Sequence, residues 1–341
     1  MVKKLILFLL LCSATYTSQA QTRVPASAPA TAGLDPAARS SLRHYQDTLK
    51  QLSQEIFLGK GDDGRQHACD AFIPMLVKAL KNKNSFRFPF DSLRTISIQY
   101  PADSSFRIFS WALERENGFY RHYGAIQMNT PDGQLKLFPL FDNSDYMTNT
   151  DTITDNKSWY GCLYYHIEQR HYFNQEFYTL FGWDANNPRS QKKIVDMLTF
   201  KNGQPVFGGP FFSFSQDSTP KPVRNRFILE YKKESSISLN FNKEKEMIIF
   251  DHLISESNEP EKKFTYVSDM DYEGFKWMMG KWMHVEKIFH DAIPIGQGPP
   301  VPAPMDVKKK SMTNPQSYDE ATGTGTAAPA TVPQKKKTTK S

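Results

Sequence analysis

From residue 86 onward, apolar and polar residues alternate along the chain with a period of two, which is typical of half-buried β-strands. Residues 95–100 and 237–241 show this pattern clearly. Turn signals separate such segments at residues 101–103, 117–118, 131–133, 202–203 and 280. Links this short join antiparallel neighbours, because a parallel pair needs a crossover of about a dozen residues or more. The sequence therefore predicts a mainly β fold, an antiparallel meander over residues 86–290 arranged as a barrel, a sandwich or a propeller.

Two α-helices are predicted over residues 36–82, before the strands begin. Apolar residues recur at steps of three and four from Leu42 to Ile56, which places them on one face of a helix. This helix is expected to begin at Pro36, with Asp35 as its cap, and to end before Gly59. The first helix is therefore amphipathic, with one apolar stripe.

The second helix is predicted to start at Asp70, because Pro74 then falls at the edge of the first turn, where a missing N–H group matters least. Phe72, Leu76 and Leu80 would form its buried face. Residues 61–64 lack the spaced ligands of a calcium loop and the pattern of a phosphate-binding loop. We interpret them as a plain turn between the helices.

The Asn117–Gly118 pair predicts a β-hairpin with a two-residue loop. Counting outward from this loop pairs Glu114 with Arg121 and Trp111 with Gly124. The second pair is physically sensible, because a large ring can lie over the bare backbone of a glycine. One face of the hairpin would then hold Phe109, Trp111, Leu113, His122 and Ile126. On that face, His122 is interpreted as a packed histidine with one hydrogen bond.

The first twenty residues have the three parts of a secretory signal peptide. A basic start at residues 1–4 precedes an apolar run at residues 5–11, and Ser18 and Ala20 supply the small residues that a signal peptidase reads. The apolar run spans only about 10 Å as a helix, too little to cross a bilayer. Cys12 follows a leucine rather than a small residue, which disfavours lipidation. Cleavage after Ala20 would deliver a protein without a transmembrane span to the periplasm or the extracellular space.

Residues 21–35 and 296–341 are rich in Pro, Ala and Thr, with too little apolar surface to offset the entropy of ordering. They are predicted to be a disordered linker and a disordered tail around a single globular body at residues 36–295. Residues 21–295 carry equal numbers of basic and acidic residues, so the net positive charge belongs to the two ends of the chain. A neutral body gives no reason to expect a nucleic-acid partner.

Two cysteines remain after cleavage, Cys69 and Cys162. In an oxidising compartment such a pair is a candidate disulfide. Two buried, unpaired thiols are equally compatible with a chain of this size. The sequence leaves both alternatives open.

Established signatures of catalytic and cofactor sites are missing from the sequence. It has no G-x-S-x-G elbow, H-E-x-x-H motif, P-loop or G-x-G-x-x-G loop, so neither a cofactor nor a metal is expected. His166 and His171 lie in a strand-like segment rather than on one helix face, and the oxygen-rich segment 142–155 lacks the ligand spacing of a calcium loop. Asp251 and His252 are adjacent on a strand, so their side chains would point to opposite faces.

The densest group of unusual residues runs from Trp159 to Asn187, where two aromatic strands flank a polar turn. Trp183 and Asp184 fall where the second strand enters a loop that contains Asn186 and Asn187. A ring beside amide and carboxylate groups can hold a sugar face or a peptide by stacking and hydrogen bonding. These four residues are therefore the candidate ligand-binding residues, and the alternative is that the aromatic rings belong to the core.

Several short strings stand out: Trp-Tyr-Gly at 159–161, Phe-Gly-Trp-Asp at 181–184 with Asn-Asn at 186–187, Val-Phe-Gly at 206–208, Phe-Asp-His-Leu at 250–253 and Asp-Tyr-Glu-Gly at 271–274. Together they resemble a group of uncharacterised exported proteins of Bacteroidota. The resemblance covers roughly residues 40–290 and leaves both ends outside. It implies a Gram-negative envelope, and it implies no established activity, fold or site residues. Ala185 stands where the pattern has a glycine.

These observations predict an exported, non-catalytic binding or envelope-associated protein, with an envelope glycan or peptide as its partner. The alternative is a glycan or peptide hydrolase whose carboxylates, such as Asp184 and Asp251, converge only in the fold. Two carboxyl groups about 5 to 9.5 Å apart in one cleft would indicate glycoside hydrolysis. The oligomeric state is left open by the sequence.

Overall fold

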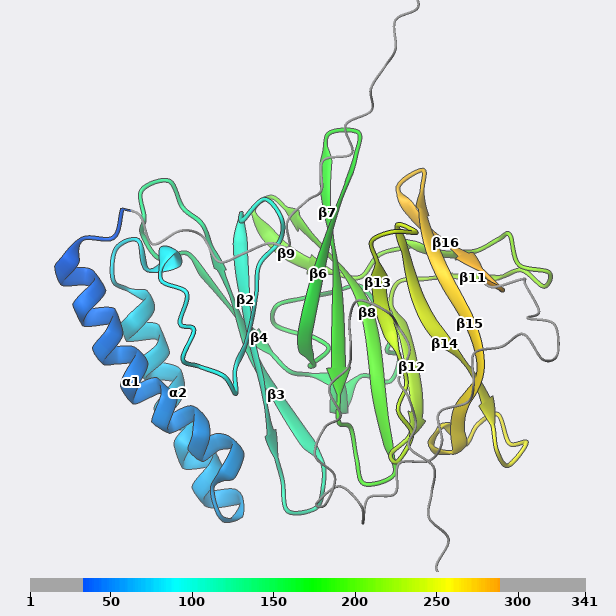
Figure 1. The fold of residues 1–341 in the computed structure, drawn as a ribbon, viewed down its shortest axis with the longest axis horizontal. Helices are drawn as coiled ribbons and strands as arrows, with labels where there is room; N and C mark the ends of the chain where they lie inside the picture. Colours follow the sequence, from blue (N-terminus) through cyan, green and yellow to red (C-terminus); the bar gives the residue numbers. More distant parts are fainter. Residues whose placement is uncertain (1–32, 289–341) are drawn as a thin grey trace, which may run out of the picture. The chain divides into compact units, whose positions relative to one another are not determined.

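The computed structural model describes residues 33–288, and β-strands make up most of their regular structure (Figure 1). This confirms the predicted mainly β fold with two helices on its N-terminal side. The predicted signal peptide, most of the predicted linker and the predicted tail at 296–341 lie outside the described residues. Within residues 33–288, every helix is too short or too polar to cross a membrane.

Helix α1 spans Pro36–Leu58 and ends at Gly59, as the apolar stripe predicts. Leu42 and Ile56 are buried on one face of this helix. Asp35 occupies the cap position, but its side chain makes no capping hydrogen bond, so that part of the prediction is wrong. Burial of the apolar face, rather than a cap, therefore stabilises α1.

Helix α2 spans Gly61–Leu80 and begins well before the predicted start at Asp70. Residues 61–64, which we interpreted as a plain turn, form its first turn, where two aspartates are favourable at the positive end of the helix dipole. Pro74 consequently lies inside the helix, where one backbone hydrogen bond is lost. Packing outweighs this cost. The predicted buried face is confirmed, since Phe72, Leu76 and Leu80 are all buried.

The strands form three sheets, which we number in chain order. The first sheet has the order β1-β2-β3-β4, with β1 Ser97–Gln99, β2 Phe106–Glu114, β3 Tyr120–Met128 and β4 Leu137–Phe141. The second sheet has the order β5-β9-β8-β7-β6, with β5 Thr154–Asp155, β6 Leu163–Tyr172, β7 Gln175–Asp184, β8 Ser190–Lys201 and β9 Gln204–Phe207, and β12 Phe227–Lys232 pairs with β8. The third sheet has the order β11-β10-β16-β15-β14-β13, with β10 Phe212–Phe214, β11 Lys221–Arg224, β13 Leu239–Asn242, β14 Met247–Ser255, β15 Tyr266–Met278 and β16 Lys281–Val285. The 3₁₀-helices η1 Ser85–Arg87, η2 Ser144–Tyr146 and η3 Lys263–Thr265 lie in connections.

Antiparallel neighbours joined by short turns dominate all three sheets, which confirms the predicted meander. Among the paired strands of residues 33–288, β10 and β16 run parallel. This pairing arises because the chain enters the third sheet with β10 and β11, returns to the second sheet with β12, and then completes the third sheet. No sequence pattern indicated this exchange between two sheets.

Three apolar cores lie between successive layers of the described residues (Figure 1). The helices and the first sheet enclose one core, which includes Trp111. The first and second sheets enclose another around Trp159 and Leu180, and the second and third sheets enclose the last around Phe181 and Trp282. The sheets therefore stack face to face as open sheets, which is the sandwich among the three arrangements we considered. The second sheet is covered on both faces.

The hairpin of β2 and β3 has a register one residue away from the prediction. Its loop holds three residues, because the N–H of Arg115 donates to the carbonyl of Phe119 at 2.8 Å. Gly118 takes a φ of 75° in this loop, which only a residue without a side chain adopts easily. Trp111 therefore pairs with Tyr123, and their rings stack with centroids 5.8 Å apart.

This shift places His122 and Ile126 on the face opposite Trp111, so the predicted composition of that face is wrong in these two members. Gly124 does lie under a tryptophan, but the ring belongs to Trp159. A Cβ atom at Gly124 would lie 3.5 Å from that ring and 2.8 Å from a backbone oxygen of β2. The first and second sheets thus approach closely at this glycine.

Candidate functional site

The sequence-predicted loop after β7 lies where the structure uses its polar groups within the chain. Trp183 is half-buried, and its Nε1–H donates to Oε1 of Gln191 at 2.9 Å. Asp184 is 5% exposed and accepts a 2.7 Å bond from the backbone N–H of Asn186. The side-chain oxygen of Asn187 accepts two backbone N–H bonds of the turn that follows. These bonds stabilise the turn, and ligand binding by this loop stays a prediction.

Asp184 belongs to a buried group of three titratable side chains between the first and second sheets. His122 on β3 lies between two carboxylates, with Nδ1 3.5 Å from Oδ2 of Asp142 and Nε2 3.5 Å from Oδ1 of Asp184. The Asp142 carboxylate also accepts bonds from Ser144 and from the backbone N–H of Gly161. A Cβ atom at Gly161 would lie 2.3 Å from that carboxylate, so only glycine fits there.

The pKa values of His122 and Asp142 are both shifted by contacts within this group. Burial alone would lower the pKa of His122, but its contact with Asp142 and the charge of Asp184 outweigh burial and raise it. Burial alone would raise the pKa of Asp142, but His122 and Ser144 outweigh burial and hold it well below its usual range. The group is therefore a buried ion cluster that ties the first sheet to the second.

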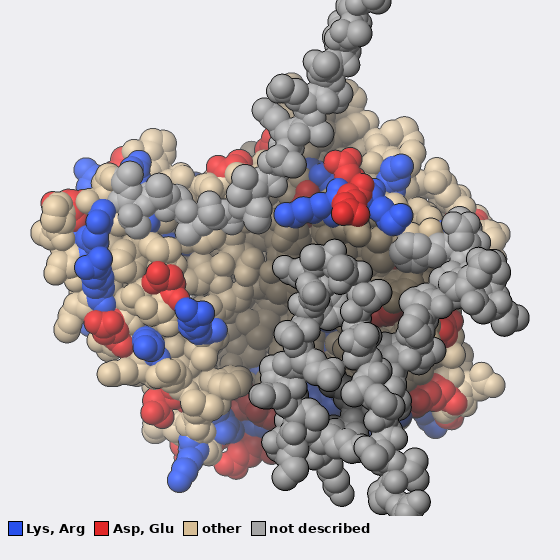
Figure 2. Space-filling view, viewed as in Figure 1, with Lys and Arg blue, Asp and Glu red and all other residues tan. Residues whose placement is uncertain are grey.

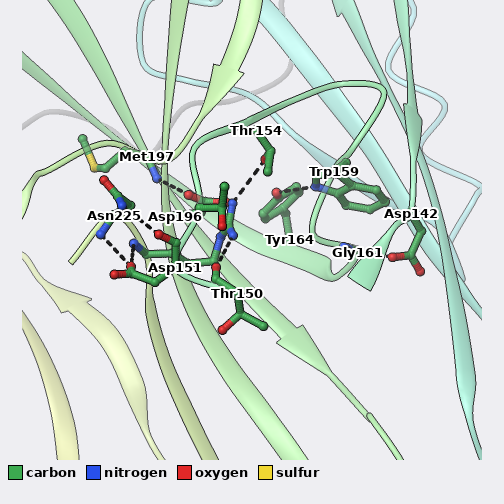
Figure 3. Close-up of polar contacts among 12 residues, drawn as sticks. Asp142, Thr150, Asp151, Thr154, Trp159, Gly161, Tyr164, Asp196, Met197 and Asn225 are labelled. Atoms are coloured by element: carbon green, nitrogen blue, oxygen red, sulfur yellow. Dashed lines mark hydrogen bonds and ion pairs between the residues drawn. The ribbon is translucent and has the colours of Figure 1, made fainter. Parts of the chain in front are cut away.

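A second buried ion pair lies close by in the second sheet. Nε of Arg226 donates to Oδ2 of Asp196 at 2.7 Å, and Nη1 donates to the carbonyl of Thr150 at 2.7 Å. Asp151 accepts bonds from the backbone N–H groups of Asn225 and Arg226. Figure 3 shows Asp151, Asp196 and Asn225 in this network. The network fixes the 149–155 loop to β8 and β12.

The oxygen-rich segment and the histidines of β6 have partners inside the chain. Asp155 accepts the backbone N–H groups of the turn after it. His166 lies 3.4 Å from Glu168, and His171 lies 2.6 Å from Glu176. Among residues 33–288, no group of three or more His, Cys, Asp or Glu side chains is arranged to hold a metal ion.

The two cysteines lie in different cores and are not joined. Cys69 on α2 is buried in the core under the helices, and Cys162 is buried between the first and second sheets. The structure therefore contradicts the candidate disulfide and shows the alternative of two buried thiols. Burial raises the pKa of both thiols, which keeps them protonated.

A cavity of about 580 Å³ opens beside the third sheet, at a place that sequence reasoning did not select. Its lining includes Gln216, Ser218, His252, Asp271, Glu273 and His284. These residues come from β14, β15, β16 and the connection between β10 and β11. We call this cavity the third-sheet pocket.

A β-bulge shapes the third-sheet pocket. Asp251 pairs with Tyr272 and Leu253 pairs with Ser268, so three residues of β15 lie opposite His252 alone. Met270, in the middle of the three, has a φ of 71°. Bulges re-aim side chains and are common beside binding sites. Here the bulge lies opposite His252, which lines the pocket, whereas the adjacent Asp251 keeps its regular pairing with Tyr272.

The side chains of Asp251 and His252 contact different parts of the structure. The Asp251 carboxylate is 7% exposed and accepts bonds from the backbone N–H of Ser238 and the hydroxyl of Ser268. His252 contributes to the pocket instead. Among the described residues, Asp251 and Asp184 share no partner, so the structure gives no support to their convergence.

Two histidines face one carboxylate in the pocket. Nδ1 of His252 lies 2.8 Å from Oδ2 of Asp269, and Nδ1 of His284 lies 2.9 Å from Oδ1 of Asp217. Both Nε2 atoms approach Glu273, at 4.0 Å for His252 and 3.5 Å for His284. Each histidine is therefore oriented by an aspartate behind it, and Glu273 lies between them.

The environments of the two histidines differ. The side chain of His252 is 38% exposed, whereas that of His284 is 2% exposed, with the rings of Phe214 and Phe275 at 4.9 and 5.1 Å. Burial alone would lower the pKa of His284, but Glu273 and Asp217 outweigh burial and raise it. His284 is thus a buried cation held by carboxylates, and His252 meets solvent at the mouth.

The lining of the pocket holds more acidic than basic groups. Asp271, Glu273 and Glu286 contribute three carboxylates, against the ammonium group of Lys287 and the protonated ring of His284. Carboxylates arranged around a cavity accept hydrogen bonds from ammonium and guanidinium groups. Chemically, the arrangement can bind a cation through its carboxylates.

Comparisons of the chain with family models, with curated proteins and with solved structures give no match. The function is therefore inferred from the site itself. The sequence did contain a signal for this site, because the Phe-Asp-His-Leu and Asp-Tyr-Glu-Gly strings contain His252, Asp271 and Glu273. Neither string shows that a bulge brings these residues together.

Proposed function

We propose that this chain is an exported binding protein that holds a basic peptide segment in the third-sheet pocket. The observation that carries the proposal is the acidic lining of the pocket around Glu273. A lysine or arginine side chain supplies the N–H donors that such a lining accepts.

Glu273 is the residue on which the proposal is tested. Because Glu273 lies between both histidines, a cation that enters the pocket would contact this carboxylate. The Glu273→Gln variant keeps the shape of the side chain and removes its negative charge. We expect at least a tenfold loss of affinity for a capped tri-lysine peptide, which corresponds to about 1.4 kcal/mol, measured by titration calorimetry.

Glu244→Gln is the matched control, because Glu244 is exposed in the turn that precedes β14 and lies outside the pocket lining. This variant should bind tri-lysine as the wild type does, and a capped tri-glutamate peptide should bind neither protein. Equal affinity of Glu273→Gln and wild type for tri-lysine would contradict the proposal.

Peptide hydrolysis is a second candidate, favoured by the presence of several carboxylates and an Asp-supported histidine in one cavity. Asp271 and Glu273 would then be the converging carboxylates. Mass spectrometry of the tri-lysine peptide after incubation with the protein separates the two candidates. An intact peptide supports binding alone.

Export is supported by the signal-peptide pattern of residues 1–20. The recognition site, on this proposal, works outside the cytoplasm. Intact-mass analysis of protein recovered from a Gram-negative host should give a mature chain that starts at Gln21. A lipid-modified Cys12 would contradict that expectation.

A further inference from the structure

Two hairpin turns carry bulky apolar residues at backbone positions that normally take glycine or asparagine. Phe173, between β6 and β7, has a φ of 52° and is 78% exposed. Met279, between β15 and β16, has a φ of 49° and is 72% exposed. Side chains of this size are disfavoured in left-handed backbone. Because both are exposed, burial in the core does not account for them either.

Another turn of the same chain shows what residue this backbone prefers. Asn202 and Gly203 form the two-residue loop between β8 and β9, with φ values of 51° and 72°. Met279 and Gly280 form the equivalent loop between β15 and β16, with φ values of 49° and 76°. Two positive φ values are the mark of a type I′ turn, in which Asn–Gly is favoured. Met279 therefore occupies an asparagine position.

The two turns touch each other, and Figure 1 shows them at the same end of their sheets. A Cβ atom at Gly280 would lie 2.6 Å from the ring of Tyr172, and that ring packs on Phe173 with centroids 4.4 Å apart. Met278, next to Met279, is 38% exposed. Phe173, Met278 and Met279 thus form one exposed apolar surface, which we call the apolar tip.

Lysines flank the apolar tip on the third sheet. Lys281 pairs directly with Met278 across β15 and β16, and Lys276 lies two residues before Met278 on the same face. Both lysines are exposed. On the face drawn in Figure 2, basic and acidic side chains are interspersed.

We propose that the apolar tip inserts into an anionic lipid surface, with Lys276 and Lys281 against the headgroups. Apolar side chains flanked by lysines are the composition that binds membrane interfaces. A lipid surface accepts a small protruding tip without a complementary shape, whereas a protein partner would need a matching groove. Contact of the Phe173 and Met279 side chains with lipid would then offset the unfavourable backbone conformation at these two positions.

The test uses a double variant that should not harm the fold. In Phe173→Asn/Met279→Asn, both turns receive a residue that tolerates their backbone, so the melting temperature should stay the same or rise. Binding to vesicles of 30% phosphatidylglycerol in phosphatidylcholine, measured by co-sedimentation, should weaken at least tenfold. Lys276→Gln/Lys281→Gln should weaken binding to these vesicles and leave the weak binding to pure phosphatidylcholine unchanged.

Phe57→Asn is the matched control, because Phe57 is 70% exposed near the end of α1, outside the apolar tip. It should bind vesicles as the wild type does. The lysines of residues 296–341 are the same in every variant, so binding that they cause would survive in the double variant. Full binding by the double variant would overturn the proposal. A wild type that binds no anionic vesicle would overturn it equally.

Discussion

At the scale of single residues, His122 joins segments that are distant in sequence. It lies on β3, while Asp142 follows β4 and Asp184 ends β7. Buried charges are tolerated only when they are paired, so the position of each carboxylate depends on the other two members. Asp184, which the sequence suggests as a ligand-binding residue, is therefore held in place by partners inside the fold.

The raised pKa of His122 predicts how stability depends on pH. Protonated His122 stabilises the fold fully below its unfolded pKa of about 6.5, and this contribution is lost as pH rises through the higher folded pKa. The urea midpoint of the wild type should therefore fall as pH rises from about 6 to about 9. His122→Gln should show a smaller fall. His284 has a raised pKa too, so the difference between the two proteins is the relevant measurement.

At the scale of elements, the β2–β3 hairpin shows how a local detail decides which face a residue occupies. A one-residue change in loop length sends every later side chain of the strand to the other face. Trp111 is 3% exposed between Phe72 and Tyr123, with ring centroids at 5.1 and 5.8 Å. It thus connects α2 to the first sheet.

Removal of that ring should be costly. Trp111→Ala is expected to lower the free energy of unfolding by about 3 to 5 kcal/mol, because a large buried side chain is lost. Glu114→Ala, an exposed residue at the end of the same strand, should cost under about 1 kcal/mol. Chemical denaturation measures both. Equal, small losses would show that Trp111 is not a core residue.

The same element-level view explains which predictions held. Leu42 in α1 and Leu239 in β13 are both buried, and each belongs to a segment with a strict apolar period. The period of such a segment distinguishes a helix from a strand and identifies its buried face. Their assignments therefore needed no tertiary information.

Other features depend on contacts that the local pattern does not contain. The start of α2 was missed because packing overrides the local cost of Pro74. The third-sheet pocket was missed because it depends on the bulge at His252 and on contact between Asp217 and His284, which are 67 residues apart. No local pattern reports such a contact.

At the scale of the whole described body, the helices and the three sheets stack in chain order. Composition alone did not indicate this order of layers. Alternation predicts that one face of each strand is buried, which suits the third sheet. The first and second sheets each have a core on both faces, and β2 and β7 accordingly have continuous runs of buried residues, 106–111 and 177–182. The strand that returns from the third sheet, β12, completes the second sheet.

Burial on both faces also determines how slowly solvent reaches the backbone of the second sheet. The amide hydrogens at the centre of β7 and β8 lie inside a hydrogen-bonded ladder, with a core above and a core below. Local opening cannot wet them, so they exchange with deuterium only when the outer layers separate as well. A deuterium label placed at the middle of this molecule during folding would therefore outlast a label placed anywhere in its outer layers.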